Sequence, residues 1–243
     1  MRRIVRIAGT ALVVAGALML VWVVVVWRWQ DPFTAAYTHW KQHQLASSYD
    51  RRFVAYRPSP TPSTTISPTV AARALEREAR HYRLGSGRGQ AIGRIRVPRL
   101  GLNMIFVNGT DEASLEKGPG RDLRTYMPGE GQLIYIAGHR TTYLAPFANI
   151  DELRPGDMIT LEVPYGTFRY RVFRHVIVAA DDLAALRSHG REVVALQACH
   201  PRFFASHRYI VYGRLAQILP RGGHAFTPPS ASLAAAPLAA AQG

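Results

Sequence analysis

One uninterrupted apolar run near the amino terminus restricts the architecture of this 243-residue chain more than any other feature. Residues 7–27, IAGTALVVAGALMLVWVVVVW, carry no charge over 21 positions. At a rise of about 1.5 Å per residue, a helix of this length spans the roughly 30 Å hydrocarbon core of a bilayer. The run is longer than the apolar region of a cleaved signal peptide, about 7 to 15 residues. We therefore expect a single transmembrane helix embedded in membrane lipid.

The residues on either side of this run indicate its orientation. Three arginines lie within the first six residues, and positive residues favour the cytoplasmic side of a membrane. Trp22, Trp27 and Trp29 at the other end have the composition of an interfacial aromatic belt. We expect residues 1–6 to be cytoplasmic and the remainder of the chain to lie outside the cell at its membrane.

Composition divides the exported part into segments. Residues 28–68 are predicted to form an extracellular spacer, stiffened by a Pro, Ser and Thr-rich stretch at 56–69. Residues 69–89 have the pattern of a helix followed by a linker. Residues 219–243 are rich in Ala and Pro, which favours a disordered tail. Residues 90–218 remain as one folded domain with a single core.

Short apolar or alternating runs broken by Gly and Pro predict that this domain is mainly β-sheet. Seven runs have this character: IGRIRV, LNMIFV, QLIYIA, MITLEV, FRYRVFRHVIV, VVALQA and RYIVYGRL. In FRYRVF, Phe168, Tyr170 and Val172 alternate with arginines, as expected of a strand with one buried face. Long amphipathic helices do not alternate with the strands, so we expect a mostly antiparallel barrel or sandwich with short helices in SLEKGP and FANIDELRP.

Cys199 is the only cysteine, so it has no partner within the chain and must be a free thiol, either buried or reactive. It follows the strand-like run VVALQA. His139 ends another such run, and Arg208 opens RYIVYG. Antiparallel pairing of the last two runs would bring Arg208 beside Cys199. A cysteine nucleophile needs a proton-transfer partner and a positive group for the oxyanion, so these three residues indicate thiol chemistry.

The charge pattern and the histidines exclude other classes of function. The net charge is +14, but the basic residues are scattered along the whole chain, which does not favour a nucleic-acid partner. His200 and His207 flank the cysteine region, yet their spacing matches no zinc motif. We expect no metal and no cofactor.

Residues 90–216 resemble the sortases, membrane-anchored cysteine transpeptidases of Gram-positive bacteria, most nearly the class E sortases of actinobacteria. The likeness runs in order through IGRIRVPRLGLNMIFVNGT, SLEKGPG, MPGEG, IAGHRTTYLAPFANIDELRPGDMITL, LQACHP and HRYIVYGRL. It implies an eight-stranded sortase-type β-barrel whose catalytic residues are His139, Cys199 and Arg208.

The resemblance also implies a reaction. Cys199 would cleave the Thr–Gly bond of an LPXTG or LAXTG-like sorting signal on a secreted protein and form a thioester. His139 would protonate the leaving amine, and Arg208 would stabilise the oxyanion. An amine of cell-wall precursor or of a pilin lysine would then release the protein in a new covalent linkage.

The chain departs from the family pattern beside the nucleophile. The family commonly has TLXTC, whereas this chain has ALQAC, with Ala195 and Ala198 in place of both threonines. We expect Ala198 to lack a hydrogen bond to the substrate. Thr141 and Tyr143 follow His139 and are candidates for the substrate groove, or for a structural role.

Two other functions fit the same residues. A cysteine hydrolase would use the same three groups, with water in place of the amine. A non-catalytic barrel would bind sorting signals without cleaving them.

Overall fold

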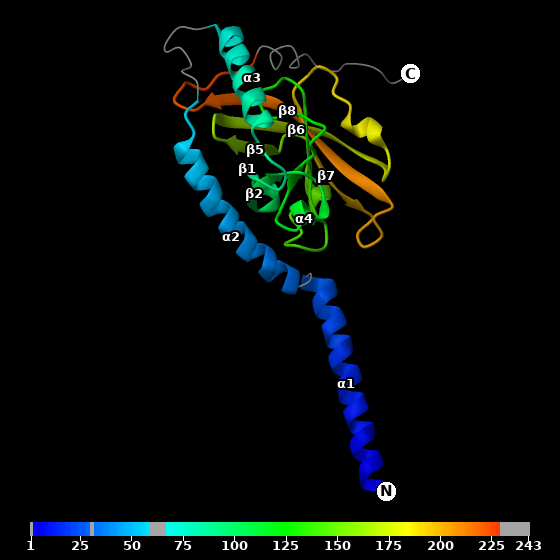
Figure 1. Cartoon of the computed structure of the whole chain (residues 1–243). Helices are drawn as coiled ribbons and strands as arrows, with labels where there is room; N and C mark the ends of the chain where they lie inside the picture. Colours follow the sequence, from blue (N-terminus) through cyan, green and yellow to red (C-terminus); the bar gives the residue numbers. More distant parts are fainter. Residues whose placement is uncertain (1, 30–31, 59–66, 229–243) are drawn as a thin grey trace, which may run out of the picture.

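Helices precede a closed β-barrel in the computed structural model, which describes residues 2–29, 32–58 and 67–228 (Figure 1). The helices are α1 (Arg2–Trp29), α2 (Pro32–Ala55), α3 (Pro68–Leu84) and the short α4 (Glu112–Leu115). The strands are β1 (Ala91–Val97), β2 (Leu102–Asn108), β3 (Gly120–Arg121), β4 (Leu133–Ala137), β5 (Met158–Val163), β6 (Gly166–Ala179), β7 (Val193–His200) and β8 (His207–Pro220). Three 3-10 turns complete the connections: η1 (Pro98–Leu100), η2 (Ile150–Glu152) and η3 (Leu183–Leu186).

The strands close in the order β1-β2-β3-β4-β7-β8-β6-β5. Two pairs, β2 with β3 and β4 with β7, are parallel, and the other pairs are antiparallel. This confirms the predicted mainly β architecture and all seven predicted strands. The eighth strand, β3, is only two residues long, so it has no alternation that sequence reading could detect.

The barrel interior is filled by the apolar residues that the alternating sequence pattern predicts to be buried. Phe168, Tyr170 and Val172 are all buried in the main core, while the arginines between them are exposed. One face of β6 is therefore apolar and the other is solvent-exposed. This alternation determines which face of the strand points into the barrel. Helix α3 covers the core with Leu75 and Tyr82.

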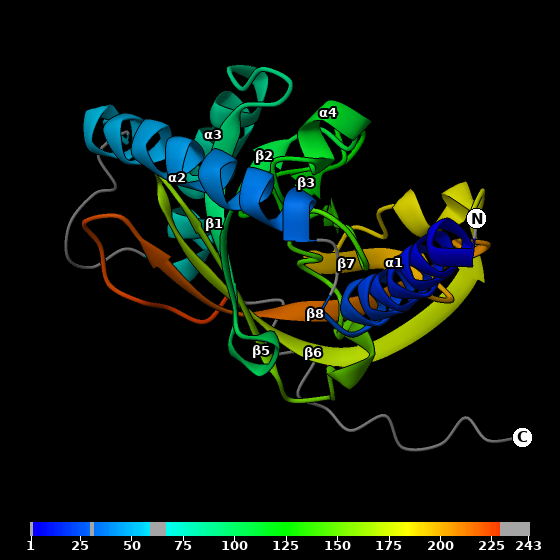
Figure 2. The ribbon, with the colours of Figure 1, turned by 90° about the horizontal axis from the view of Figure 1, so that it is seen from below.

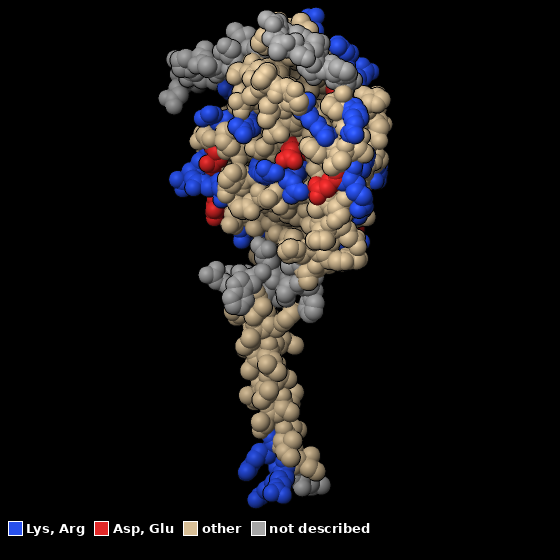
Figure 3. All heavy atoms as spheres, turned by 90° about the vertical axis from the view of Figure 1, so that its left-hand side faces the viewer, with Lys and Arg blue, Asp and Glu red and all other residues tan. Residues whose placement is uncertain are grey.

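Helix α1 has the length and composition of a membrane span. Within Arg2–Val25, an 18-residue window has a mean hydropathy of 2.4, and none of that window is buried against the rest of the protein. Figure 3 shows an uncharged shaft with basic residues at its free end. The belt expected at Trp27 and Trp29 falls on side chains outside the described part of the structure.

Residues 32–55, which we expected within an extracellular spacer, form helix α2 and pack on the barrel. The Gln42 amide donates to the carbonyls of Ile105 and Lys117 and accepts from the Ile105 N–H. Tyr49 is fully buried and donates its hydroxyl to the Glu162 carbonyl. Leu45, Tyr49 and Phe53, spaced four residues apart, also form a short apolar stripe that packs against β1 and β2. Residues 59–66 of the expected spacer lie outside the described residues.

Residues 219–228, expected to belong to a disordered tail, are structured. Strand β8 continues to Pro220, and Phe226 pairs with Ile218 through two backbone hydrogen bonds. The Phe226 ring packs against the main core, which explains why this part of the chain is structured. Residues 229–243 lie outside the described residues.

A buried carboxylate holds the turn before β4 against the barrel. Glu192 accepts hydrogen bonds from the Tyr170 hydroxyl at 2.7 Å, the Gly129 N–H at 3.0 Å and the Gly131 N–H at 2.9 Å. Burial outweighs these hydrogen bonds and raises the pKa of Glu192 from its ordinary value of 4.5 to about 7. Between these two pH values the folded state keeps a proton that the unfolded chain has lost.

This proton makes folding stability depend on pH. As pH rises from 4.5 to about 7, Glu192 should lower the free energy of unfolding by about 3 kcal/mol, because the carboxyl ionises readily in the unfolded chain while burial keeps it protonated in the folded one. Glu192→Gln should flatten that dependence in denaturant unfolding of the full chain at about pH 5 and about pH 8. The control Glu152→Gln, which alters an exposed carboxyl, should retain the wild-type slope. An unchanged slope in Glu192→Gln would contradict the assignment.

Candidate active site

The free thiol and an arginine face each other across the last hairpin. β7 and β8 pair antiparallel, and their register puts Cys199 opposite Arg208, as the predicted pairing requires. Cys199 is half-buried and unpaired by any disulfide. The eight residues between them close the hairpin, so local geometry alone brings the two side chains together.

His139 reaches the same place from a strand far away in the sequence. β4 lies parallel to β7 with Ala137 opposite Gln197, and the Gly138 N–H donates to the Gln197 carbonyl at 3.0 Å. A Cβ atom on Gly138 would lie 2.6 Å from the Phe147 ring, so only glycine allows this close approach. Because parallel strands end at one edge of the sheet, His139 and Cys199 leave it at the same end.

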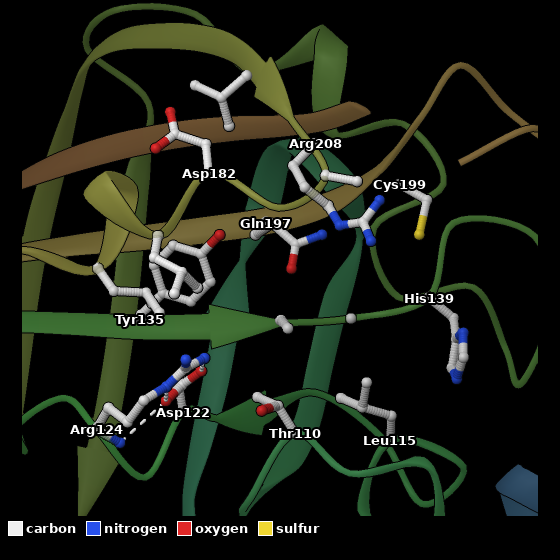
Figure 4. Close-up of a pocket in the computed structure, with 16 residues that line it drawn as sticks. Thr110, Leu115, Asp122, Arg124, Tyr135, His139, Asp182, Gln197, Cys199 and Arg208 are labelled. Atoms are coloured by element: carbon white, nitrogen blue, oxygen red, sulfur yellow. Dashed lines mark hydrogen bonds and ion pairs between the residues drawn. The ribbon is translucent and has the colours of Figure 1, made fainter. Parts of the chain in front are cut away.

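One cavity of about 290 Å³ contains all three residues. Figure 4 shows the Arg208 guanidinium extending toward the Cys199 sulfur, while the His139 ring lies apart from them and points away from the sulfur. The other residues that line the cavity are Thr110, Leu115, Asp122, Arg124, Tyr135, Ala137, Gly138, Val178, Ala180, Asp182, Leu183, Leu186 and Gln197. A concave site of this kind, with convergent polar groups at one end, is suited to binding a ligand next to the thiol.

The surroundings of His139 favour its neutral form. Burial lowers the pKa of His139, and the carboxylates of Glu116 and Glu112 only partly oppose this. Its Nε2 atom is buried and has no hydrogen-bond partner among the described residues. A neutral imidazole that lines the same cavity as a thiol is suited to exchanging a proton with it when the two groups approach.

Arg208 is held by its own loop. Its Nη1 donates to the Ala205 carbonyl at 2.7 Å and to the His207 carbonyl at 3.0 Å. A guanidinium remains charged at any physiological pH. The cavity therefore has a fixed positive group next to Cys199, where negative charge would develop on an attacked carbonyl.

Sequence reasoning missed Arg140, the residue after His139. It is 5% exposed, and its Nη1 lies 3.3 Å from the Cys199 carbonyl and 3.0 Å from His200 Nδ1. Its Nη2 pairs with Asp151 at 2.8 Å. Arg140 thus ties the backbone of the nucleophile to the segment after His139. The only sequence signal was an arginine adjacent to the candidate histidine, which is too common to be informative.

The structure also places the three lower-ranked candidates. Ala198 is fully buried in the main core and does not line the cavity, because adjacent strand residues point to opposite faces. The side chain at this position therefore points away from the cavity, and a substrate-binding role for Ala198 stays a prediction. Thr141 and Tyr143 are half-buried and are not among the cavity residues. Tyr143 instead packs against the His139 ring, with ring centroids 5.0 Å apart.

The end of the cavity away from the thiol contains an ion pair that the sequence did not reveal. Both oxygens of the buried Asp122 accept hydrogen bonds from Arg124, which approaches at 2.7 Å. Burial alone would raise the pKa of Asp122, but the Arg124 hydrogen bonds outweigh it and lower the pKa. Asp122 therefore stays ionised in the wall of the cavity.

The sortase domain family matches residues 95–216, half of the chain. This protein belongs to the sortase family. Sortase D of Bacillus subtilis (strain 168) is 36% identical over 130 residues, which cover 52% of this chain and 64% of the relative. Sortase SrtE1 of Streptomyces coelicolor is 27% identical over 150 residues, covering 55% of this chain and 42% of the relative.

A solved structure supports the same family. The crystal structure of Sortase E1 from Streptomyces coelicolor with a tripeptide in the active site is 25% identical, with a TM-score of 0.52, covering 55% of this sortase and 93% of that chain. Class E is thus among the relatives, as the motifs indicated, together with sortase D. The matched region of this sortase spans between 42% and 64% of the curated relatives.

Proposed function

We propose that this sortase is a cysteine transpeptidase, held by α1 in the cell membrane with its barrel outside the cell. Its substrates are secreted proteins that carry an LPXTG or LAXTG-like sorting signal. The observation that carries the proposal is the convergence of Cys199, Arg208 and His139 on one cavity. The tripeptide in the active site of the Streptomyces coelicolor relative supports a peptide ligand.

Acylation follows from the positions of the three groups. The neutral His139 imidazole accepts the Cys199 proton, and the thiolate attacks the threonine carbonyl carbon of the signal. The Arg208 guanidinium stabilises the oxyanion that forms. The C–N bond to glycine then breaks, the imidazolium gives its proton to the glycine nitrogen, and a thioester remains on Cys199.

Transfer to the acceptor reverses the proton movements. An amine, from cell-wall precursor or a pilin lysine, attacks the thioester carbonyl and loses a proton to His139. The C–S bond breaks, the Cys199 sulfur regains a proton, and the secreted protein is joined to the acceptor by an amide. Water in place of the amine would give hydrolysis by the same route.

Mass spectrometry of the full chain in detergent tests this function. The protein is incubated with LAXTG and LPXTG peptides, with and without triglycine. We expect a thioester on Cys199 and, when the amine is present, an amide-linked product. Hydrolysed peptide alone in the presence of triglycine would indicate a hydrolase. Peptide binding with no adduct on folded, reduced protein would indicate a barrel that only binds signals.

Replacing Arg208 by lysine should keep the charge but lower kcat/KM by about 100-fold. A single ammonium cannot reproduce the planar set of donors that is anchored to the loop and directed at the oxyanion. The control is Arg214→Lys on the same strand, where the guanidinium stacks on Phe173 at 4.2 Å instead of lining the cavity. Wild-type turnover in Arg208→Lys would remove the proposed role.

A further inference from the structure

The turn after His139 has an unusual backbone. Tyr143, Leu144 and Ala145 have φ values of 51°, 62° and 37°, so three consecutive non-glycine residues are in the left-handed region. L-amino acids rarely adopt this conformation because Cβ crowds the backbone. Such a turn persists only where neighbouring groups hold it, and residues of this kind cluster at functional sites.

Helix α2 supplies the groups that hold this turn. The Thr34 hydroxyl oxygen accepts the Tyr143 N–H at 3.1 Å. One turn later, the fully buried Thr38 donates its hydroxyl to the Glu116 carbonyl at 3.0 Å. The Tyr143 hydroxyl donates to Glu116 Oε1 at 3.2 Å. These hydrogen bonds connect the start of α2 to the turn at Tyr143 and to Glu116, which follows α4.

Tyr143 and Glu116, the two residues held by α2, both lie close enough to influence His139. The Tyr143 ring lies 5.0 Å from the His139 ring, centroid to centroid, at an angle of 40°. The Glu116 carboxylate is the larger of the two anionic influences that raise the pKa of His139, the other being Glu112. Cys199 and Arg208 are ionisable groups that line the same cavity as His139.

We propose that the first two turns of α2 position His139 for catalysis, through Thr34 on Tyr143 and Thr38 on Glu116. This inference rests on the proposed function, because it assigns His139 a role in that reaction. Helix α2 follows α1 after only residues 30 and 31, and it packs across β1 and β2 (Figure 2). The start of α2, which follows the candidate membrane helix, thus helps to hold His139 in position. Removing the chain up to the end of α2 would remove these hydrogen bonds.

The test uses three variants of the full chain in detergent. Thr34→Ala removes the acceptor of the Tyr143 N–H, and Thr34→Ser retains it. Ser47→Ala is the matched control, because Ser47 lies on the same helix and its hydroxyl donates to the His43 carbonyl of that helix. We expect Thr34→Ala to lower kcat for thioester formation about tenfold, with KM changed less than about twofold. Thr34→Ser and Ser47→Ala should have wild-type kcat.

A second readout separates positioning from general stability. NMR titration of His139 should give a lower pKa in both Thr34→Ala and Glu116→Gln. Thr34→Ala releases Tyr143, whose hydroxyl holds the Glu116 carboxylate, and Glu116→Gln removes the negative charge. In either case Glu116 no longer favours the imidazolium. Ser47→Ala should leave that pKa unchanged. Tyr143→Phe, which keeps the ring and loses the hydroxyl, should also lower kcat while the thermal midpoint stays within about 3 °C of wild type.

The outcomes distinguish this inference from the proposed function. If wild-type protein forms no thioester, the proposed function fails, and the His139 titration still tests the positioning. If wild-type protein is active and Thr34→Ala retains both its kcat and the His139 pKa, the inference is overturned. A loss of activity that only parallels a fall in thermal midpoint, with an unchanged His139 pKa, would also overturn it.

Discussion

Cys199→Ala should abolish thioester formation and lower kcat/KM by at least about 1,000-fold. The thiolate is the only group in the cavity that can become covalently attached to the signal in the proposed reaction. The fold should survive, because Cys199 is half-buried at a strand end and contributes little to the core. The measurement is peptide cleavage with triglycine, followed by mass spectrometry.

Cys199→Ser is the companion variant, because it keeps the size of the side chain and replaces sulfur by a poorer nucleophile. It should bind signal peptides as wild type does and turn them over very slowly. Cleavage at the wild-type rate in Cys199→Ala would show that another residue performs the chemistry.

His139→Ala should reduce amide product formation by about 100-fold to 10,000-fold, since the same imidazole accepts the thiol proton and donates to the leaving amine. The other histidines near the thiol are poorly placed for this task. His200 follows Cys199 on β7 and so points to the opposite face, where its Nδ1 lies 3.0 Å from Arg140. His207 is exposed and lies 2.9 Å from the Ser206 hydroxyl.

The control for this prediction is His207→Ala, which should retain nearly the wild-type rate of product formation. Circular dichroism of both variants should match wild type. A normal rate in His139→Ala would transfer the proton-exchange role to His200 or His207 and would contradict the proposed mechanism.

The chain's local patterns determined a large part of this structure. An uncharged run of 21 residues defined helix α1, and alternating apolar residues located seven of the eight strands. The pairing of Cys199 with Arg208 was also predictable, because one short hairpin joins their strands. Periodicity and short loops report burial and local pairing directly, so these features needed no knowledge of distant contacts.

The remainder depended on contacts between distant segments. The parallel pairing of β4 with β7 brings His139 to the same end of the sheet as the thiol. The sequence of neither strand indicates that the other is its neighbour. Helix α2 docks through the Gln42 amide and a short apolar stripe, and only the tertiary structure shows which barrel strands these residues meet. Arg140 becomes a link to Cys199 only once those strands meet. Local sequence indicates which face of a helix or strand is buried. Only the closed barrel determines which elements pack against one another, and therefore which side chains meet in the site.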